Sequence, residues 1–137
     1  MLKPLLVAVL LTGLCTPVAV GATAPPSTCL EPPVSDKNEL CVDLLPYSGK
    51  EFAGYGRFVP TAKDAPDQLD VVVQQSRTMW PEPLTIAKKT VTGNGEISAV
   101  TDAGAISADA TAVRACATGF VLTGSRAYDV CTPWQPV

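Results

Sequence analysis

The chain has 137 residues, 47% of them hydrophobic, and its 10 basic and 13 acidic residues give a formal net charge of −3. This length suits a single domain with its own core. A weakly acidic chain without long runs of like charge is not suited to coat a nucleic acid backbone or an anionic membrane, so we expect neither as a partner.

Residues 1–22 have the features of a secretory signal peptide. Lys3 supplies a positive charge, residues 5–14 form an apolar stretch, and small residues follow. We expect cleavage after Ala22, with cleavage after Ala24 as the alternative. A membrane anchor is the competing interpretation, but the apolar stretch is too short to span a bilayer. The sequence therefore predicts a secreted, extracellular protein that leaves the membrane after cleavage.

Four cysteines follow the predicted cleavage site: Cys29, Cys41, Cys116 and Cys131. In a small exported chain this number indicates two disulfides. We favour Cys29–Cys41 and Cys116–Cys131, because each closes a short loop and should contribute about 3 kcal/mol. The two crossed pairings remain open. A zinc site would need more closely spaced cysteine pairs, so we predict neither a metal nor another cofactor.

Residues 23–38 are rich in proline and predict an extended N-terminal arm, followed by one domain over residues 39–137. In that domain, short segments rich in valine, isoleucine, threonine and aromatic residues alternate with turn residues. They predict an all-β fold, a single β-sandwich (immunoglobulin-like or jelly-roll-like) of about seven short antiparallel strands. The segments are 39–47, 55–60, 68–76, 83–92, 96–101, 110–123 and 126–132. The alanine-rich stretch 102–113 is compatible with a helical turn, a strand or a loop.

Residues 88–100 predict a first hairpin around the loop Gly93–Gly95. A three-residue loop places Val91 opposite Ile97 and Thr92 opposite Glu96. Apolar residues then face apolar residues and polar residues face polar ones, as a half-buried sheet requires.

Residues 114–132 predict a second hairpin. A two-residue turn at 123–124 places Cys116 directly opposite Cys131 and Gly119 opposite Tyr128. An aromatic side chain that covers a glycine on the neighbouring strand is a common feature of sheets. This register supports the Cys116–Cys131 disulfide independently of the loop lengths.

Asp64, Asp67 and Asp70 lie in a predicted loop that enters a strand. Three carboxylates close together could bind calcium, but their spacing matches no known calcium loop. We therefore interpret them as solvated acids that cap a turn. A carboxylate pair of the kind used by glycosidases is the remaining catalytic option, because the chain has no histidine and no phosphate-binding glycine motif.

Aromatic residues in loops are the candidate binding residues. Trp80 lies in a loop between two predicted strands, where Pro81 and Pro83 follow it and stiffen the loop. Trp134 follows the last cysteine. Tyr55 lies near a glycine-rich turn that also holds Tyr47 and Phe52. Exposed aromatic side chains on a small sandwich can stack on sugar rings or fill a pocket on a protein partner. The alternative for both tryptophans is that they cap the open ends of the core.

The stretch "CATGFVLTGSRAYDVCTPW", residues 116–134, resembles part of a complement-control (sushi) module, which carries C-x-x-G-Y-x-L-x-G followed by a cysteine and a tryptophan. The resemblance covers this stretch alone. A sushi module has its cysteines closer together and places the last one after the tryptophan, whereas only "QPV" follows Trp134 here. The whole chain also resembles short exported proteins of alanine-rich, lysine-poor bacterial secretomes, which implies secretion and a β-rich body without a function.

The function that we predict is that of a secreted, non-catalytic protein that binds an extracellular protein or glycan surface through Trp80, Trp134 and Tyr55. The sequence leaves two alternatives. One is a small inhibitor or toxin that acts through the hairpin braced by Cys116 and Cys131. The other is a carboxylate-dependent hydrolase.

Overall fold

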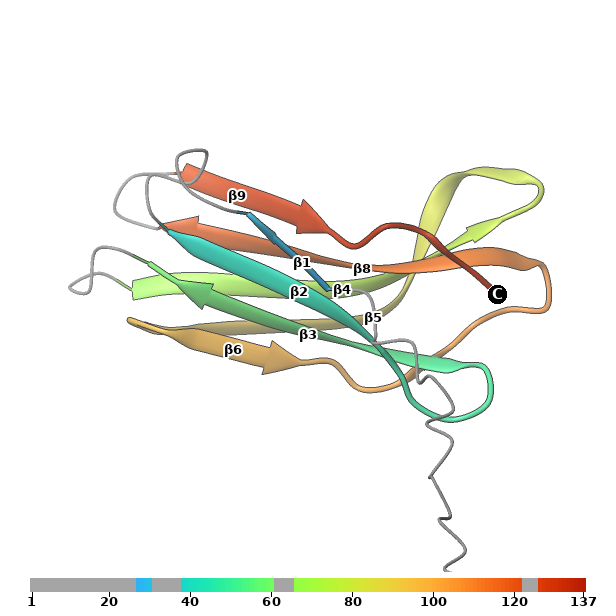
Figure 1. The fold of residues 1–137 in the computed structure, drawn as a ribbon, viewed down its shortest axis with the longest axis horizontal. Helices are drawn as coiled ribbons and strands as arrows, with labels where there is room; N and C mark the ends of the chain where they lie inside the picture. The colour runs from blue at the N-terminus through green and yellow to red at the C-terminus, as the bar shows by residue number, and fades with distance from the viewer. Residues whose placement is uncertain (1–26, 31–37, 61–65, 122–125) are drawn as a thin grey trace, which may run out of the picture.

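The computed structural model describes residues 27–30, 38–60, 66–121 and 126–137, which form ten β-strands and no helix (Figure 1). The predicted signal peptide lies outside these residues. The strands are β1 (Ser27–Leu30), β2 (Glu39–Pro46), β3 (Glu51–Val59), β4 (Pro66–Arg77), β5 (Trp80–Asn94), β6 (Ile97–Val100), β7 (Gly104–Ala105), β8 (Ala110–Val121), β9 (Arg126–Cys131) and β10 (Gln135–Pro136). The seven predicted segments correspond to β2 to β6, β8 and β9, and the short strands β1, β7 and β10 are additional.

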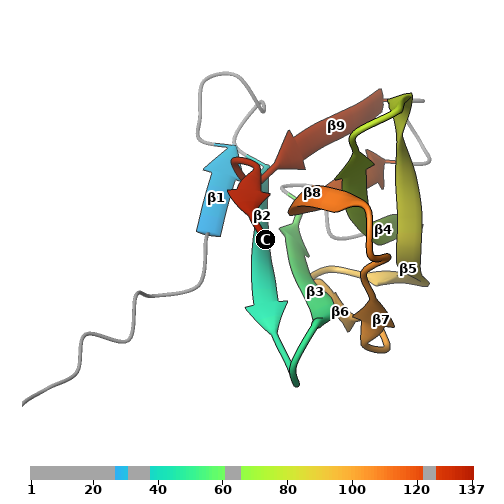
Figure 2. The same cartoon turned by 90° about the vertical axis from the view of Figure 1, so that its right-hand side faces the viewer.

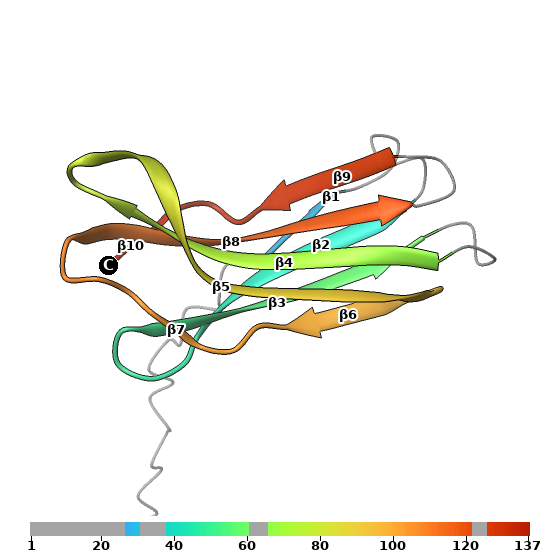
Figure 3. The same cartoon turned by 180° about the vertical axis from the view of Figure 1, so that it is seen from behind.

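The strands form two antiparallel sheets. In sheet A the order is β1-β2-β3-β6, with β7 also paired to β3. In sheet B the order is β10-β8-β4-β5, with β9 also paired to β8. Figure 2 shows the two sheets as facing layers, and Figure 3 shows β4 and β5 from the side of sheet B. This arrangement confirms the predicted all-β sandwich.

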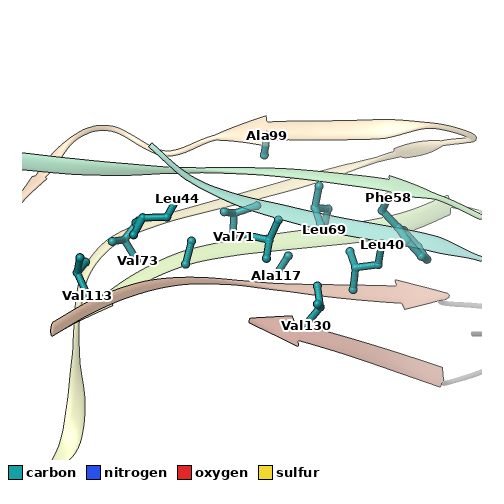
Figure 4. Close-up of a cluster of buried hydrophobic side chains, with 12 residues drawn as sticks. Leu40, Leu44, Phe58, Leu69, Val71, Val73, Ala99, Val113, Ala117 and Val130 are labelled. Atoms are coloured by element: carbon teal, nitrogen blue, oxygen red, sulfur yellow. The ribbon is translucent and has the colours of Figure 1, made fainter. Parts of the chain in front are cut away.

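The hydrophobic core lies between the sheets, because alternate residues of β2, β3, β4 and β8 point inward (Figure 4). Phe58 is the largest fully buried side chain. Gly54 and Gly56 of β3 face β4 so closely that a Cβ atom on Gly56 would collide with Val71. The other principal core residues are Leu40, Val42, Leu44, Leu69, Val73, Val113, Ala115, Ala117 and Val130.

The hairpin of β8 and β9 has the predicted register, with Cys116 opposite Cys131 and Gly119 opposite Tyr128. The predicted turn at residues 123–124 lies outside the described residues. The reason for glycine at position 119 differs from the expected one. A Cβ atom there would lie 2.9 Å from the ring of Phe58, which reaches across from sheet A. Phe58 therefore fills the space above Gly119, with the Tyr128 ring 6.4 Å away from its own.

The predicted hairpin around Gly93–Gly95 is wrong. Val91 pairs with Leu69 of β4, whereas Ile97 pairs with Phe58 of β3, so the two strands belong to different sheets. Val91 and Ile97 both pack against the common core, one from each sheet. Both residues are directed toward the core as expected, but they belong to different sheets and are not cross-strand partners.

Both favoured disulfides are present, Cys29–Cys41 and Cys116–Cys131. Each joins residues that lie directly opposite on neighbouring strands. The crossed pairings, including the one that a sushi module would require, are therefore excluded. Residues 27–30 of the predicted arm form β1, which pairs with β2 along its whole length.

The hairpin of β4 and β5 extends beyond the strands of sheet A. Its tip is visible as the yellow-green end at the upper right of Figure 1 and at the upper left of Figure 3. A two-residue turn, Thr78–Met79, joins the strands, and Arg77 pairs with Trp80. The pairing of β4 and β5 is irregular between Val73 and Arg77, where the hairpin bends.

Candidate functional site

The three aromatic residues predicted to bind lie in three separate places. Trp80 is the first residue of β5 at the hairpin tip, and Tyr55 is in β3 of sheet A. Trp134 lies between β9 and β10, beside sheet B. They therefore do not form one site. Trp80 is in a strand and not in the loop that we predicted, because β5 begins earlier than the predicted segment.

Exposed apolar side chains extend along the hairpin from its tip to Leu84, which pairs with Gln75. Met79 is 84% exposed, Trp80 is 59% exposed and Leu84 is 42% exposed. The Arg77 guanidinium lies over the Trp80 ring at 4.8 Å from its centroid, a distance at which a cation is attracted to the ring face. The indole ring is thus oriented by one contact and still largely open to solvent.

Two prolines follow Trp80 in β5, beside the tip. Pro81 and Pro83 lie in β5, and both are exposed. A proline lacks the N–H group that a central strand needs, but β5 is an edge strand of sheet B and tolerates it. The prolines restrict the backbone beside Trp80, so less conformational entropy remains to be lost when a partner binds.

A buried glutamine anchors the base of the hairpin. Gln75 is 1% exposed, and its Nε2 donates to Ser107 Oγ at 2.7 Å while its Oε1 accepts from Ser107 N at 2.8 Å. The Ser107 hydroxyl in turn donates to Asp109 Oδ1 at 2.6 Å. The Thr78 N–H donates to the Asp109 carbonyl at 3.4 Å. These bonds tie β4 to the segment before β8 and hold the tip on a fixed base.

Trp134 packs against sheet B and is less accessible than Trp80. It is 36% exposed, and its ring lies 4.3 Å from the Arg114 guanidinium. Arg114 Nε also donates to Gln74 Oε1 at 3.0 Å, so the guanidinium is held between β4 and the tryptophan. The nearby Thr132 is buried and accepts a hydrogen bond from Ala115 N at 3.1 Å. Arg114 alternates along β8 with the buried Val113 and Ala115, so Trp134 lies on the outer face of sheet B and not over an end of the core.

Tyr55 lies on the outer face of sheet A and is half-buried. It stands in a row across three strands, with Asp43 on one side and Val100 on the other. Arg57, the next outward residue of β3, forms ion pairs with two glutamates. Tyr55 is therefore near other polar groups in sheet A, whereas both tryptophans belong to sheet B or lie beside it.

Asp67 differs most from its predicted environment. It is fully buried, and neither of its carboxylate oxygens has a hydrogen-bond partner among the described residues. Burial raises the pKa of this carboxyl group, since the charged form loses its hydration. The interpretation of Asp67 as a solvated loop acid is therefore wrong. Asp70 is half-buried and accepts a hydrogen bond from Gln68, and Asp64 lies outside the described residues.

The substitution Asp67→Asn is expected to raise the free energy of unfolding at pH 7 by about 1–3 kcal/mol, because it removes an uncompensated buried charge. The folded-state pKa lies above the ordinary value of 3.8, so the wild type loses stability as the pH rises from that value through the folded-state pKa. The gain from the substitution should grow over this range and vanish below it. Urea unfolding at a series of pH values measures it.

Asp70→Asn is the matched control and should change the free energy of unfolding at pH 7 by less than about 0.5 kcal/mol, since Asp70 retains access to solvent on β4. A less stable Asp67→Asn variant at pH 7 would show that Asp67 has a favourable partner.

The described residues contain no cluster of three or more histidine, cysteine, aspartate or glutamate side chains able to hold a metal ion. In the same part of the chain no helix has the length and apolar character to cross a membrane. Burial is the cause of the raised pKa of Asp67. Among the described residues, Glu39 and Glu96 are brought together because both carboxylates bind the Arg57 guanidinium. The hydrolase alternative remains a prediction.

Sequence reasoning did not single out Met79, which precedes Trp80 in the turn, or Leu84, which follows it in β5, as contact residues. It also did not identify the anchor formed by Gln75 and Ser107. The two glutamines at positions 74 and 75, within an otherwise valine-rich strand, were the available signal for a polar contact at this end of the sandwich.

Comparison of the chain with protein-family models, with curated proteins and with solved structures finds no match.

Proposed function

We propose that this protein is a secreted, non-catalytic binding protein that contacts its partner through the tip of the β4–β5 hairpin. The observation that carries the proposal is the exposed group of Met79, Trp80 and Leu84 on a hairpin that extends beyond the facing sheet. Two disulfides are consistent with an oxidising, extracellular environment.

The chemistry of the tip favours a protein partner. Tryptophan and methionine are enriched in protein interfaces, and a tryptophan in such a position often supplies a large part of the binding energy. Leu84 and Met79 add apolar surface that a sugar ring would not need. A glycan that stacks on Trp80 alone is the other partner class. Substitution of Met79 and Leu84 distinguishes a protein partner from a glycan.

Trp80→Ala is expected to weaken binding by about 30-fold, which corresponds to about 2 kcal/mol for a residue at the centre of an interface. The free energy of unfolding should change by less than about 1 kcal/mol, since the indole is mostly exposed. An array of extracellular proteins and glycans probed with the mature protein, followed by titration of each positive partner, measures the first quantity. Urea unfolding measures the second.

Trp134→Ala is the matched control, because it removes the same side chain from another arginine contact. It should leave binding unchanged. Met79→Ala and Leu84→Ala together should also weaken binding to a protein but not to a glycan. If Trp80→Ala binds like the wild type, or if it destabilises the fold by several kcal/mol, the hairpin tip is not the contact surface.

A further inference from the structure

A second candidate site lies on the outer face of sheet A, away from the hairpin tip. It is a hollow of about 360 Å³ bounded by the ends of β2, β3 and β6 and by the segment that follows β6. Leu45, Ala53 and Val100 line it with apolar surface, and Tyr47 and Asp102 also contribute to its lining. Its size and lining suit one side chain or a small ligand.

The register of sheet A explains why these residues meet outside the core. Gly54 and Gly56 of β3 face β4, so Ala53 and Tyr55 point to the opposite side. Leu45 pairs with Ala53, and Tyr55 pairs with Val100. The small side chain of Ala53 leaves room between its larger neighbours.

Hydrogen bonds hold the walls of the hollow in place. Thr101 is 5% exposed, and its N–H donates to the Gly54 carbonyl at 2.9 Å while its Oγ1 accepts from Gly54 N at 3.0 Å. The same hydroxyl donates to the carbonyl of Asp102 at 2.9 Å. On the other side, Tyr47 N donates to the Glu51 carbonyl at 2.9 Å. The hollow is thus preformed, and little ordering is needed for a ligand to enter.

The polar groups around the hollow favour a cation. Asp102 is exposed at its rim, and Asp43 lies in the adjacent row beside Tyr55. The described residues that line it include no lysine or arginine. Tyr47 is 74% exposed, so the face of its ring is available to a positive charge.

We propose that this hollow binds a lysine or arginine side chain of a partner polypeptide. The apolar stem lies along Leu45, Ala53 and Val100, and the charged end lies by Asp102 and the Tyr47 ring. The long apolar stem and terminal charge of these two side chains match a site with an apolar lining and an acidic rim. The proposal does not depend on the hairpin tip, which is in sheet B.

The test uses the full mature protein, labelled with ¹⁵N, and titrates it with a hexalysine and a hexaarginine peptide. Hexaglutamate and maltotriose are the acidic and neutral comparison ligands. We expect saturable shifts in the amide signals of Ala53, Val100 and Ala103 with both basic peptides and not with the comparison ligands. Shifts spread evenly over the surface, no shifts, or equal shifts with maltotriose would overturn the proposal.

Two substitutions test the residues. Asp102→Asn and Tyr47→Ala should each weaken binding of the basic peptides by about fivefold, the size expected of one exposed ionic or cation–π contact. Both side chains are exposed, so the fold should be retained. Glu82→Gln is the matched control, since it removes the same charge at the hairpin tip. An equal effect of Glu82→Gln would mean that net charge alone attracts the peptides.

Trp80→Ala distinguishes this proposal from the proposed function. It should weaken binding to the partner of the hairpin tip by about 30-fold and leave the peptide shifts in sheet A unchanged. Loss of both activities in this one variant would mean that the hollow is not an independent site.

Discussion

Phe58→Ala is expected to lower the free energy of unfolding by about 3–5 kcal/mol, the usual cost of removing a fully buried aromatic ring. Phe58 reaches from β3 to β8, where its ring lies against Gly119. The cavity left by the substitution would lie between the two sheets, and Gly119 has no side chain with which to fill it. Urea unfolding followed by tryptophan fluorescence measures the loss.

A second substitution tests the contact itself. Gly119→Ala in the wild type should cost about 1–3 kcal/mol, because the new methyl group would lie 2.9 Å from the Phe58 ring. In a Phe58→Leu background the same change should cost less, since the smaller side chain leaves room for it. Tyr47→Ala is the control for loss of a ring on the surface and should have little effect on stability. Strictly additive effects of the two substitutions would contradict the predicted contact.

The double variant Cys116→Ala/Cys131→Ala is expected to lose about 3 kcal/mol of stability, from the loop-entropy effect of a disulfide with a sequence separation of 15. The disulfide Cys29–Cys41 has a separation of 12, so loop entropy alone predicts almost the same loss. The structure predicts a difference between them. Strand β9 contributes the buried Val130, whereas β1 contributes to the core only through the half-buried Leu30.

We therefore expect Cys29→Ala/Cys41→Ala to release β1 locally with a smaller loss of global stability. Native-state hydrogen exchange distinguishes the two cases, because the amides of β1 should lose protection while those of β2 and β3 retain it. In the variant without Cys116 and Cys131, protection should fall throughout the sandwich. Equal global losses in both variants would show that loop length alone determines the contribution.

Pairing between neighbouring segments could be predicted from the sequence, but pairing across the sandwich could not. The β8–β9 register followed from one short turn and two opposed cysteines. The same reasoning failed at Val91 and Ile97, because an apolar match looks identical whether two residues pair within a sheet or face each other from two sheets. Only the arrangement of all the strands separates these cases.

For the candidate site, the sequence identified Trp80 as a candidate contact residue but did not identify the side chains exposed beside it. The prolines beside Trp80 suggested a stiff loop, whereas Trp80, Pro81 and Pro83 all lie in strand β5. The exposure of Met79 and Leu84 depends on how far the hairpin extends past sheet A, which no local pattern records. Asp67 was interpreted as a loop residue because the predicted strand began at Gln68. Strand β4 begins at Pro66, and this places the Asp67 side chain in the interior.

The central position of β4 in sheet B has a consequence for the timing of folding. Its first neighbour, β5, follows it directly, but its second neighbour, β8, is among the last strands to be synthesised. Until β8 emerges, Val71 and Val73 lack one of the strands that pack beside them. Pairing between such distant segments makes folding slow, because a large loop must close first. The chain therefore completes its fold only after almost all of it has been made.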